Sequence, residues 1–355
     1  MRGEPIGQPS MFCVVTMESL VPQEHPLRVV KRMADDALRK LSPLFDKMYA
    51  STGRPSVPPE RLLKSLLLIA LHSVRSERMF CEQIRYNLLF RWFLDLEANE
   101  EGFDASTFSQ NRERLLRHEV SARFLAAVVE QAKGANLLSA EHFSVDGTLI
   151  EAWASLKSFR PKEGDDGDGK GWGDFSGTTR TNETHESKTD PEAKLMRKGH
   201  GREAKLSYGG HALMDNRHGL LVDLRISEAN GHAERDIALE MIDEAAKGGG
   251  VTLGADKGYD TRGFVASCRE RGVTPHVTQN QHARRRSAID RRTTRHRGYR
   301  LSQVVRMSIE KIFGWIKTIG GLRRTRFRGK ERTQLAATMV AAAYNLLRMS
   351  KLLTA

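Results

Sequence analysis

Three acidic residues of this chain stand where carboxylates can take part in metal-dependent chemistry. Within residues 142–150, Phe143 and Val145 alternate with Ser144 and Asp146, which predicts a strand that ends at Asp146 on its polar side. Asp256 ends a second alternating stretch, and a glycine within two residues of each acid is expected to let the backbone turn. Glu310 lies in residues 304–317, which have helical periodicity. Oxygen ligands without Cys or His favour Mg²⁺ or Mn²⁺.

The order of the surrounding elements predicts how these acids meet. From Phe143 we expect a strand, a hairpin, a helix, a strand, a helix, a strand, a basic segment and a final helix. After the first strand, the expected bounds are 208–214 and 220–226 for the hairpin, 235–246, the strand ending at Asp256, 261–271 and 274–278. This is the order of a ribonuclease-H-like domain, an α/β (α+β) fold with a mixed sheet whose first and fourth strands are neighbours.

Neighbouring strands would bring Asp146 and Asp256 to one edge of the sheet, and the helix of Glu310 could pack across it. Carboxylates at that density repel one another unless cations neutralise them. Two divalent ions ~3.5–4 Å apart would activate an attacking oxygen and stabilise a leaving one in phosphodiester displacement.

The helix of Glu310 has a polar stripe and a core face. At about 100° per residue, the stripe contains Arg306, Glu310, Gly314 and Lys317. The core face contains Val305, Ile309, Ile312, Phe313 and Ile316. We expect Arg306 and Lys317 to hold phosphates, with Gly314 admitting a ligand backbone at a cost of ~1 kcal/mol relative to Ala. Taken alone, the stripe is better explained as a surface array of salt bridges.

Positive charge is concentrated around Glu310. The segment His282–Lys330 has 16 Lys and Arg against two acids, a net charge of +14; the whole chain carries +13, which leaves −1 for the remainder. A basic surface confined to one segment indicates phosphate backbone as the partner, and a solvated charge run fits less well because apolar periodicity resumes inside it. Besides Arg306 and Lys317, the candidate DNA contacts are Arg284, Arg285, Arg286, Arg291, Arg292, Arg323, Arg324, Arg326 and Arg328.

Two domains are predicted, since 355 residues exceed the usual single-domain size of ~100–200. Residues 1–136 are expected to be all-helical, with a first long helix ending near Pro43. The polar helix 104–115 is compatible with helix-turn-helix recognition of DNA and equally with a packing or dimerisation module. Residues 137–355 are expected to be the catalytic domain, with a flexible Gly- and Asp-rich insertion at about 157–205.

The composition predicts neither a membrane protein nor a disulfide-stabilised one. The sequence has no apolar run of about 18 residues and no signal-peptide pattern. Its cysteines, Cys13, Cys81 and Cys268, are too far apart for a disulfide framework or a zinc-ligand spacing. We expect a cytoplasmic protein.

The three acids lie in the motifs Asp146-Gly147-Thr148, Asp256-Lys257-Gly258-Tyr259 and Arg306-x3-Glu310-x6-Lys317. Together these motifs resemble those of bacterial insertion-sequence transposases of the DDE class, in particular the insertion-sequence-five-like group. The segments Gly314–Thr318 and Gly321–Arg326 are also typical of that group, and the resemblance extends over roughly residues 50–350. One position departs from the pattern, because Gln303 stands where the group has Tyr.

The resemblance implies that Asp146, Asp256 and Glu310 are catalytic metal ligands for two Mg²⁺ or Mn²⁺ ions, and that Arg306 and Lys317 contact DNA. It implies a DNA transposase that binds the terminal inverted repeats of an insertion sequence, cuts to release a 3′-hydroxyl and joins it to target DNA. Pairing of two double-stranded ends implies at least a homodimer, in the bacterial cytoplasm and on the nucleoid when bound to DNA.

Two other functions stay open at this stage. A structure-specific or ribonuclease-H-type nuclease would share the metal pocket and need no strand transfer. A former transposase retained for DNA binding or repression would not need the three acids, and their presence argues against it.

Overall fold

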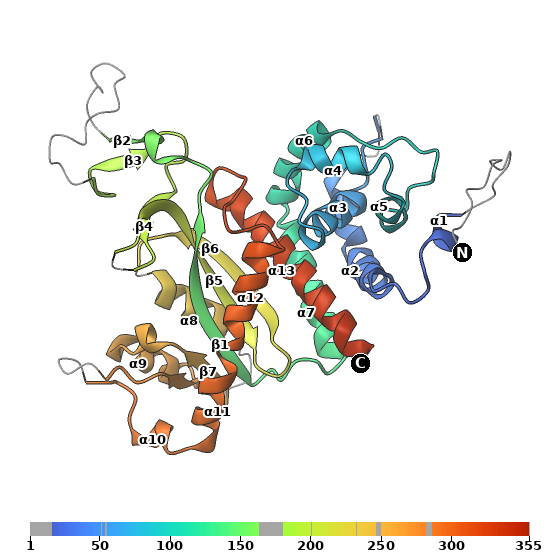
Figure 1. Cartoon of the computed structure of the whole chain (residues 1–355). Helices are drawn as coiled ribbons and strands as arrows, with labels where there is room; N and C mark the ends of the chain where they lie inside the picture. The colour runs from blue at the N-terminus through green and yellow to red at the C-terminus, as the bar shows by residue number, and fades with distance from the viewer. Residues whose placement is uncertain are drawn as a thin grey trace, which may run out of the picture.

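The fold is a mixed α/β structure in which a helical N-terminal part precedes a mixed sheet (Figure 1). The computed structural model describes residues 16–50, 52–53, 55–162, 180–199, 201–231, 233–245, 250–281 and 286–354. The helices before the sheet are α1 (Met17–Leu20), α2 (Leu27–Met48), α3 (Pro59–Leu71), α4 (Glu77–Gln83), α5 (Leu88–Phe93), α6 (Ala105–Arg117) and α7 (Val120–Gly134). The later ones are α8 (Ala233–Ala245), α9 (Arg262–Glu270), α10 (Arg291–Thr294), α11 (Arg297–Val305), α12 (Ser308–Thr318) and α13 (Lys330–Leu353).

The sheet is built around β1 (His142–Glu151). This strand pairs antiparallel with β5 (Ala204–Asp215) and parallel with β7 (Thr252–Ala255). Beyond them, β6 (Leu220–Glu228) pairs antiparallel with β5, and β8 (Thr274–Val277) pairs parallel with β7. The order β6-β5-β1-β7-β8 is that of a ribonuclease-H-like domain, which confirms the predicted fold class and the neighbouring first and fourth strands.

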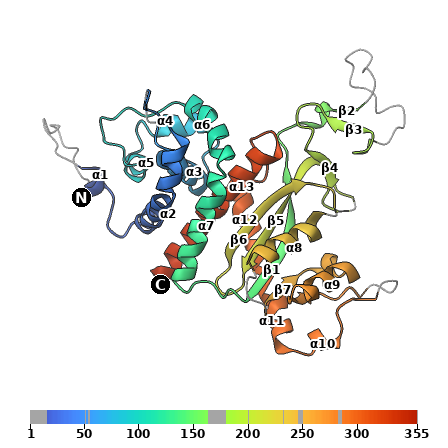
Figure 2. The same ribbon diagram turned by 180° about the vertical axis from the view of Figure 1, so that it is seen from behind.

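Alternation along β1 divides the core between the two faces of the sheet. Phe143 and Val145 belong to an apolar cluster with residues of α8 and α9. Ile150 belongs to another cluster, with residues of α12 and α13. Figures 1 and 2 show α12 and α8 on opposite sides of the sheet. Because side chains alternate with a period of two, Asp146 lies on the α12 face.

The long helix α13 joins the sheet to the helical part. It packs on β6 and also on α7, α3 and α2, between the two parts of the molecule (Figure 1). The Asn345 amide accepts a hydrogen bond from Leu221 N at 2.9 Å and donates one to Leu221 O at 2.7 Å. Gln334 makes a similar pair of bonds with β6. These amides satisfy backbone groups that an edge strand otherwise leaves unpaired.

Two regions differ from the expected elements, while the flexibility of the insertion stays a prediction. Within the predicted insertion, the described residues form β2 (Phe159–Pro161), β3 (His185–Ser187) and β4 (Lys194–Arg197), and β4 extends the main sheet by pairing with β5. The glycine-rich residues 163–179 lie outside the described residues. The helix expected over 304–317 is two helices, because Met307, Ile309 and Glu310 donate to the carbonyl three residues back instead of four.

The first long helix also continues past its predicted end. Proline stands inside α2 at position 43, and the helix runs on to Met48. Phe45 and Met48 are buried beyond the proline. Their burial offsets the cost of a proline inside a helix.

Among the described residues, no helix combines the length and the apolar character that crossing a membrane requires.

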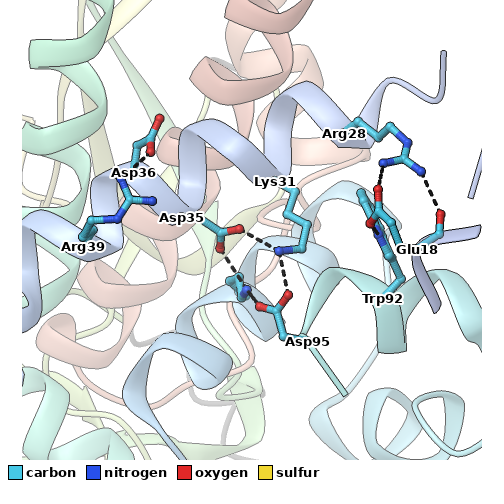
Figure 3. A network of polar contacts seen from close by, with 9 residues as sticks. Glu18, Arg28, Lys31, Asp35, Asp36, Arg39, Trp92 and Asp95 are labelled. Carbon is cyan, nitrogen blue, oxygen red and sulfur yellow. Dashed lines mark hydrogen bonds and ion pairs between the residues drawn. The ribbon is translucent and has the colours of Figure 1, made fainter. Parts of the chain in front are cut away.

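A network of charged side chains ties α2 to α3 and to the turn after α5 (Figure 3). Lys64 is 3 % exposed, and its Nζ lies 2.9 Å from Asp35 Oδ1 and also contacts the Asp95 carboxylate. Lys31 Nζ lies 2.7 Å from Asp35 Oδ2 and 2.7 Å from Asp95 Oδ1. Burial by itself would raise the pKa of Asp95, but the hydrogen bonds from Lys31 and Lys64 outweigh burial and lower it. Two lysines thus share two aspartates, and the buried ammonium group is neutralised.

We expect Asp95→Asn to lower the free energy of unfolding by about 1–2 kcal/mol at neutral pH, because Lys64 keeps a single carboxylate. Asn tolerates the φ of 53° at this position. Since the folded-state pKa of Asp95 is lowered, its contribution is lost as the pH falls through that pKa, and the two proteins should converge in acid. Urea unfolding across pH measures this.

Asp36→Asn is the matched control, since Asp36 pairs on the same helix with Arg39, whose side chain is 74 % exposed. We expect it to change stability by less than about 0.5 kcal/mol. An equal loss in the two variants would contradict the role of the network.

Candidate active site

The two predicted strand acids lie where β7 leaves the sheet. Parallel pairing of β1 with β7 stops at Ser144 and Gly254. β1 then continues along β5 to Glu151, so the turn expected at Gly147 does not occur. β7 ends at Ala255, and the next residue is Asp256. The edge of β1 beside Asp146 is therefore open, and Asp256 stands next to this opening.

Each acid is held by a backbone amide close to it in sequence. Asp146 Oδ1 accepts a hydrogen bond from Gly147 N at 2.8 Å, and Asp256 Oδ1 accepts one from Gly258 N at 2.7 Å. Burial raises the pKa of Asp146 to about 6; the Gly147 N–H opposes this, and the negative charges of Asp256 and Glu234 add to it. The structure therefore brings Asp146 and Asp256 within electrostatic range of each other.

Glu234 is the residue near this site that sequence reasoning missed. It stands in the first turn of α8, and burial followed by the charge of Asp256 raises its pKa. From the sequence it is an ordinary acid at a helix start, where it interacts favourably with the helix dipole. A signal was present only in Gly147, whose missing side chain makes room for the Glu234 carboxylate.

The helix α12 runs along β1 on the face of Asp146. A Cβ on Gly254, which pairs with Ser144, would lie 3.6 Å from Arg306 Cβ. Farther along, Lys317 Nζ donates to Thr148 Oγ1 at 2.6 Å. Glu310 lies between these two contact points in the sequence, in the first turn of α12.

The Glu310 side chain is exposed, and no hydrogen bond or ion pair reaches its carboxylate from the described residues. Among those residues, no group of three His, Cys, Asp or Glu side chains is placed to hold one metal ion. The three-acid pocket is not closed in this structure, and joint metal binding by Asp146, Asp256 and Glu310 stays a prediction.

The oxygen donors at this site nevertheless fit a hard divalent cation. Mg²⁺ is usually held by one or two carboxylates together with water and substrate phosphates, and seldom by a cage made entirely of protein. Asp146 and Asp256 supply two such carboxylates beside an open strand edge. Burial raises the pKa of Asp146, and a cation there would remove the repulsion by Asp256 and Glu234 that adds to this rise.

Gln303, the residue that departs from the family pattern, anchors Arg306. Its Nε2 donates to His276 O at 2.5 Å, and its Oε1 accepts from Thr278 Oγ1 at 2.6 Å and from Arg306 Nε at 3.1 Å. Tyr299 on the same helix donates to Val277 O at 3.1 Å. These bonds fix α11 to the end of β8. They hold the guanidinium within electrostatic range of Asp146, where its positive charge partly opposes the rise in pKa that burial causes.

The arginines of the basic segment differ in what they contact. Arg324 donates to the carbonyls of Ala152 and Trp153, Arg326 donates to Val74 O, and Arg292 pairs with Asp290. Among the predicted DNA contacts, the exposed side chains that form no hydrogen bond or ion pair with other described residues are Arg286, Arg291, Arg323 and Arg328. Arg284 and Arg285 lie outside the described residues. The four exposed arginines without a partner are therefore available to a ligand.

The predicted recognition helix, α6, uses several polar side chains within the protein. Asn111 is buried and donates to Thr107 O at 2.9 Å. Arg112 pairs with Glu77 and lies over the Phe327 ring. Arg114 lies over the Tyr49 ring. These contacts favour the packing role that the sequence left open, and DNA recognition by α6 stays a prediction.

Two family models match the sequence. A transposase domain (DUF772) matches residues 15–114, and the transposase DDE domain matches residues 139–346, more than half of the chain. The chain belongs to the DDE transposase family. The second match contains Asp146, Asp256 and Glu310. Membership of the insertion-sequence-five-like group stays a prediction.

Solved structures of other transposases are similar to this transposase only distantly. The piggyBac transposase synaptic complex with hairpin DNA has a TM-score of 0.41 and 9% identity over 92% of this chain and 75% of that chain. A pre-cleavage Mos1 transpososome has a TM-score of 0.21 and 9% identity over 85% of this chain and 82% of that chain. A Mos1 paired-end complex with the left transposon end has a TM-score of 0.21 and 12% identity over 94% of this chain and 88% of that chain. These values are too low to bear on function. No curated protein matches this transposase.

We expect Asp146→Asn to stabilise this transposase by about 1–3 kcal/mol at pH 8 in EDTA, because it removes a carboxylate whose ionisation the fold disfavours. The folded-state pKa is raised, so the cost of the charge is fully present above about pH 6 and disappears as the pH falls toward the unfolded value near 4. Thermal unfolding of the unsubstituted protein and of Asp146→Asn, recorded from pH 8 down to about pH 4, measures this difference in stability. A constant difference across that range would contradict the assignment.

Proposed function

We propose that this transposase binds the terminal inverted repeats of an insertion sequence, cuts them and transfers the cut strand to target DNA. The observation that supports it best is the placement of Asp146 and Asp256 at the open edge beside β7, in a chain of the DDE family. Arg306 and Lys317 border the same face of β1. The carboxylates that would bind cations are thus flanked by the positive side chains that would bind phosphates.

The proposed chemistry consists of two displacements at phosphorus. In the first, a water oxygen attacks a phosphodiester at the element end, and the bond to O3′ breaks to leave a 3′-hydroxyl and a 5′-phosphate. In the second, that hydroxyl attacks a target phosphodiester, whose own bond to O3′ breaks. Two bound Mg²⁺ or Mn²⁺ ions would supply the activation of the attacking oxygen and the stabilisation of the leaving one.

The residues of this chain have distinct roles in that scheme. We assign Asp146, Asp256 and Glu310 to holding the cations. Arg306, fixed by Gln303, and Lys317, fixed by Thr148, would neutralise phosphate oxygens on either side. Burial lowers the pKa of Lys317, and a phosphate next to it would favour the charged form again.

We further infer how the DNA is bound. Residues 137–355 act as the catalytic domain and residues 1–136 contribute to recognition of the ends. The unpaired arginines at 286, 291, 323 and 328 contact the backbone of double-stranded DNA. Since two ends must be joined in one reaction, the working assembly is a homodimer or larger.

Asp256→Asn tests the chemistry. We expect it to abolish cleavage and joining while DNA binding changes less than about twofold, because a cation ligand is lost and the basic surface is intact. The substrate is a plasmid carrying the DNA that flanks the reading frame on both sides, incubated with Mg²⁺ or Mn²⁺ and a target plasmid. Joined product supports transposition, and cleavage without joining supports a nuclease.

Asp236→Asn is the control for this experiment. Asp236 is exposed in the first turn of α8 and has the same charge as Asp256. We expect full cleavage in this variant. Normal cleavage by Asp256→Asn, or equal loss in both variants, would remove Asp256 from the proposed site.

Arg323→Ala tests the DNA contacts. We expect weaker binding of the same flanking DNA and a salt slope, d log K/d log [salt], reduced by about one, because one phosphate contact is lost. Fluorescence anisotropy over a range of NaCl concentrations measures the slope. Arg326→Ala is the comparison, since Arg326 already donates to Val74 O inside the protein. Arg326→Ala should lower the melting temperature and leave the salt slope unchanged. If the DNA-binding constant of the unsubstituted protein did not depend on salt, phosphate contacts would be excluded.

A further inference from the structure

A fourth carboxylate reaches the opening beside Asp146 from the other face of the sheet. Glu234 belongs to α8, which lies on the face opposite to α12 (Figures 1 and 2). A Cβ on Gly147 would lie 1.9 Å from Glu234 Oε1 and 2.8 Å from its Cδ. The carboxylate group therefore occupies the space that any other side chain at 147 would fill. Gly147 follows Asp146 on the strand edge that β7 leaves open.

The negative charges gathered here are not paired. In the part of the chain that the structure describes, no Lys or Arg forms an ion pair with Asp146, Asp256 or Glu234. Arg306 and Arg235 act on them only at longer range. Partly buried carboxylates that repel one another destabilise the fold unless a cation neutralises them.

A buried hydroxyl group gives an independent indication of a ligand at this place. Tyr259 follows the Asp256 motif and is 1 % exposed. Its hydroxyl has no hydrogen-bond partner within the described residues. The charges that act on it are those of Glu234, Asp146 and Asp256. Buried polar groups in native proteins nearly always have a hydrogen-bond partner, so an unpaired one indicates that a ligand or water binds here.

We propose that Glu234 is a positioning residue of the divalent-cation site, where it adds a third negative charge beside Asp146 and Asp256 and strengthens cation binding. Gly147 makes this possible because its missing side chain lets the carboxylate reach the strand edge. Glu234 acts through the field at the site and is not required to share one ion with the two aspartates, in keeping with the placement of the described side chains. The inference rests on the proposed function only in taking those aspartates as cation ligands.

The test measures Mn²⁺ binding by the full-length protein without DNA. Melting temperature is recorded in EDTA and at rising MnCl₂ concentration for the unsubstituted protein, Glu234→Gln, Glu234→Asp and the control Asp236→Asn. Glu234→Gln keeps the size of the side chain and removes its charge. We expect it to bind Mn²⁺ about tenfold more weakly and to melt at the same or a higher temperature in EDTA. Glu234→Asp, which keeps the charge, should restore most of the affinity, and the control should behave as the unsubstituted protein.

Each other outcome overturns the proposal. If Glu234→Gln binds Mn²⁺ within twofold of the unsubstituted protein, the charge at 234 plays no part in cation binding. If Glu234→Gln and Glu234→Asp both melt lower in EDTA and lose affinity equally, Glu234 is a packing residue. If the unsubstituted protein shows no Mn²⁺-dependent stabilisation, the site has no such cation. Because the readout needs no DNA, a protein with Glu234-dependent Mn²⁺ binding that neither cuts nor joins DNA ends would retain this inference and lose the proposed function.

Discussion

The parallel pairing of β1 with β7 determines where the acidic residues of this protein lie. Since pairing with β7 ends at Ser144 and Gly254, β1 continues with that edge unpaired until Glu151 pairs with Arg324, and Asp146 lies on the open stretch. Asp256 follows β7 directly and so stands beside it. The electrostatic properties of the site follow from its geometry, because carboxylates gathered at a partly buried edge repel one another.

The second constraint is the alignment of α12 with β1. Two polar contacts set it: Gln303 joins Arg306 to the end of β8, and Lys317 donates to Thr148. Between them the apolar residues of α12 pack against α13 and the sheet. The helix is therefore fixed at both ends, and the exposed residue between them, Glu310, projects without a partner among the described residues.

The helical N-terminal part is coupled to this site through α13. One apolar cluster includes residues of the N-terminal helices, α12, α13 and the β5–β6 face of the sheet. The amides of Gln334 and Asn345 bind the edge of β6, and Ser73 Oγ donates to Ile319 O just after α12. The helical part and the face of the sheet that carries α12 therefore share one core. A shared core of this kind resists independent movement of the two parts.

The sequence by itself determined the strand that carries Asp146, the strand that Asp256 follows, the order of the sheet and most of the predicted core face, where Ile309, Ile312, Phe313 and Ile316 are buried and Val305, in α11, is partly buried. These features depend on local periodicity, which any fold must respect. Only the tertiary structure decided that β1 continues past Gly147 and that Glu234 fills the space beside it, because both depend on contacts between segments far apart in the chain. Local propensity gives no information about which distant carboxylate will occupy the gap that a missing Cβ leaves.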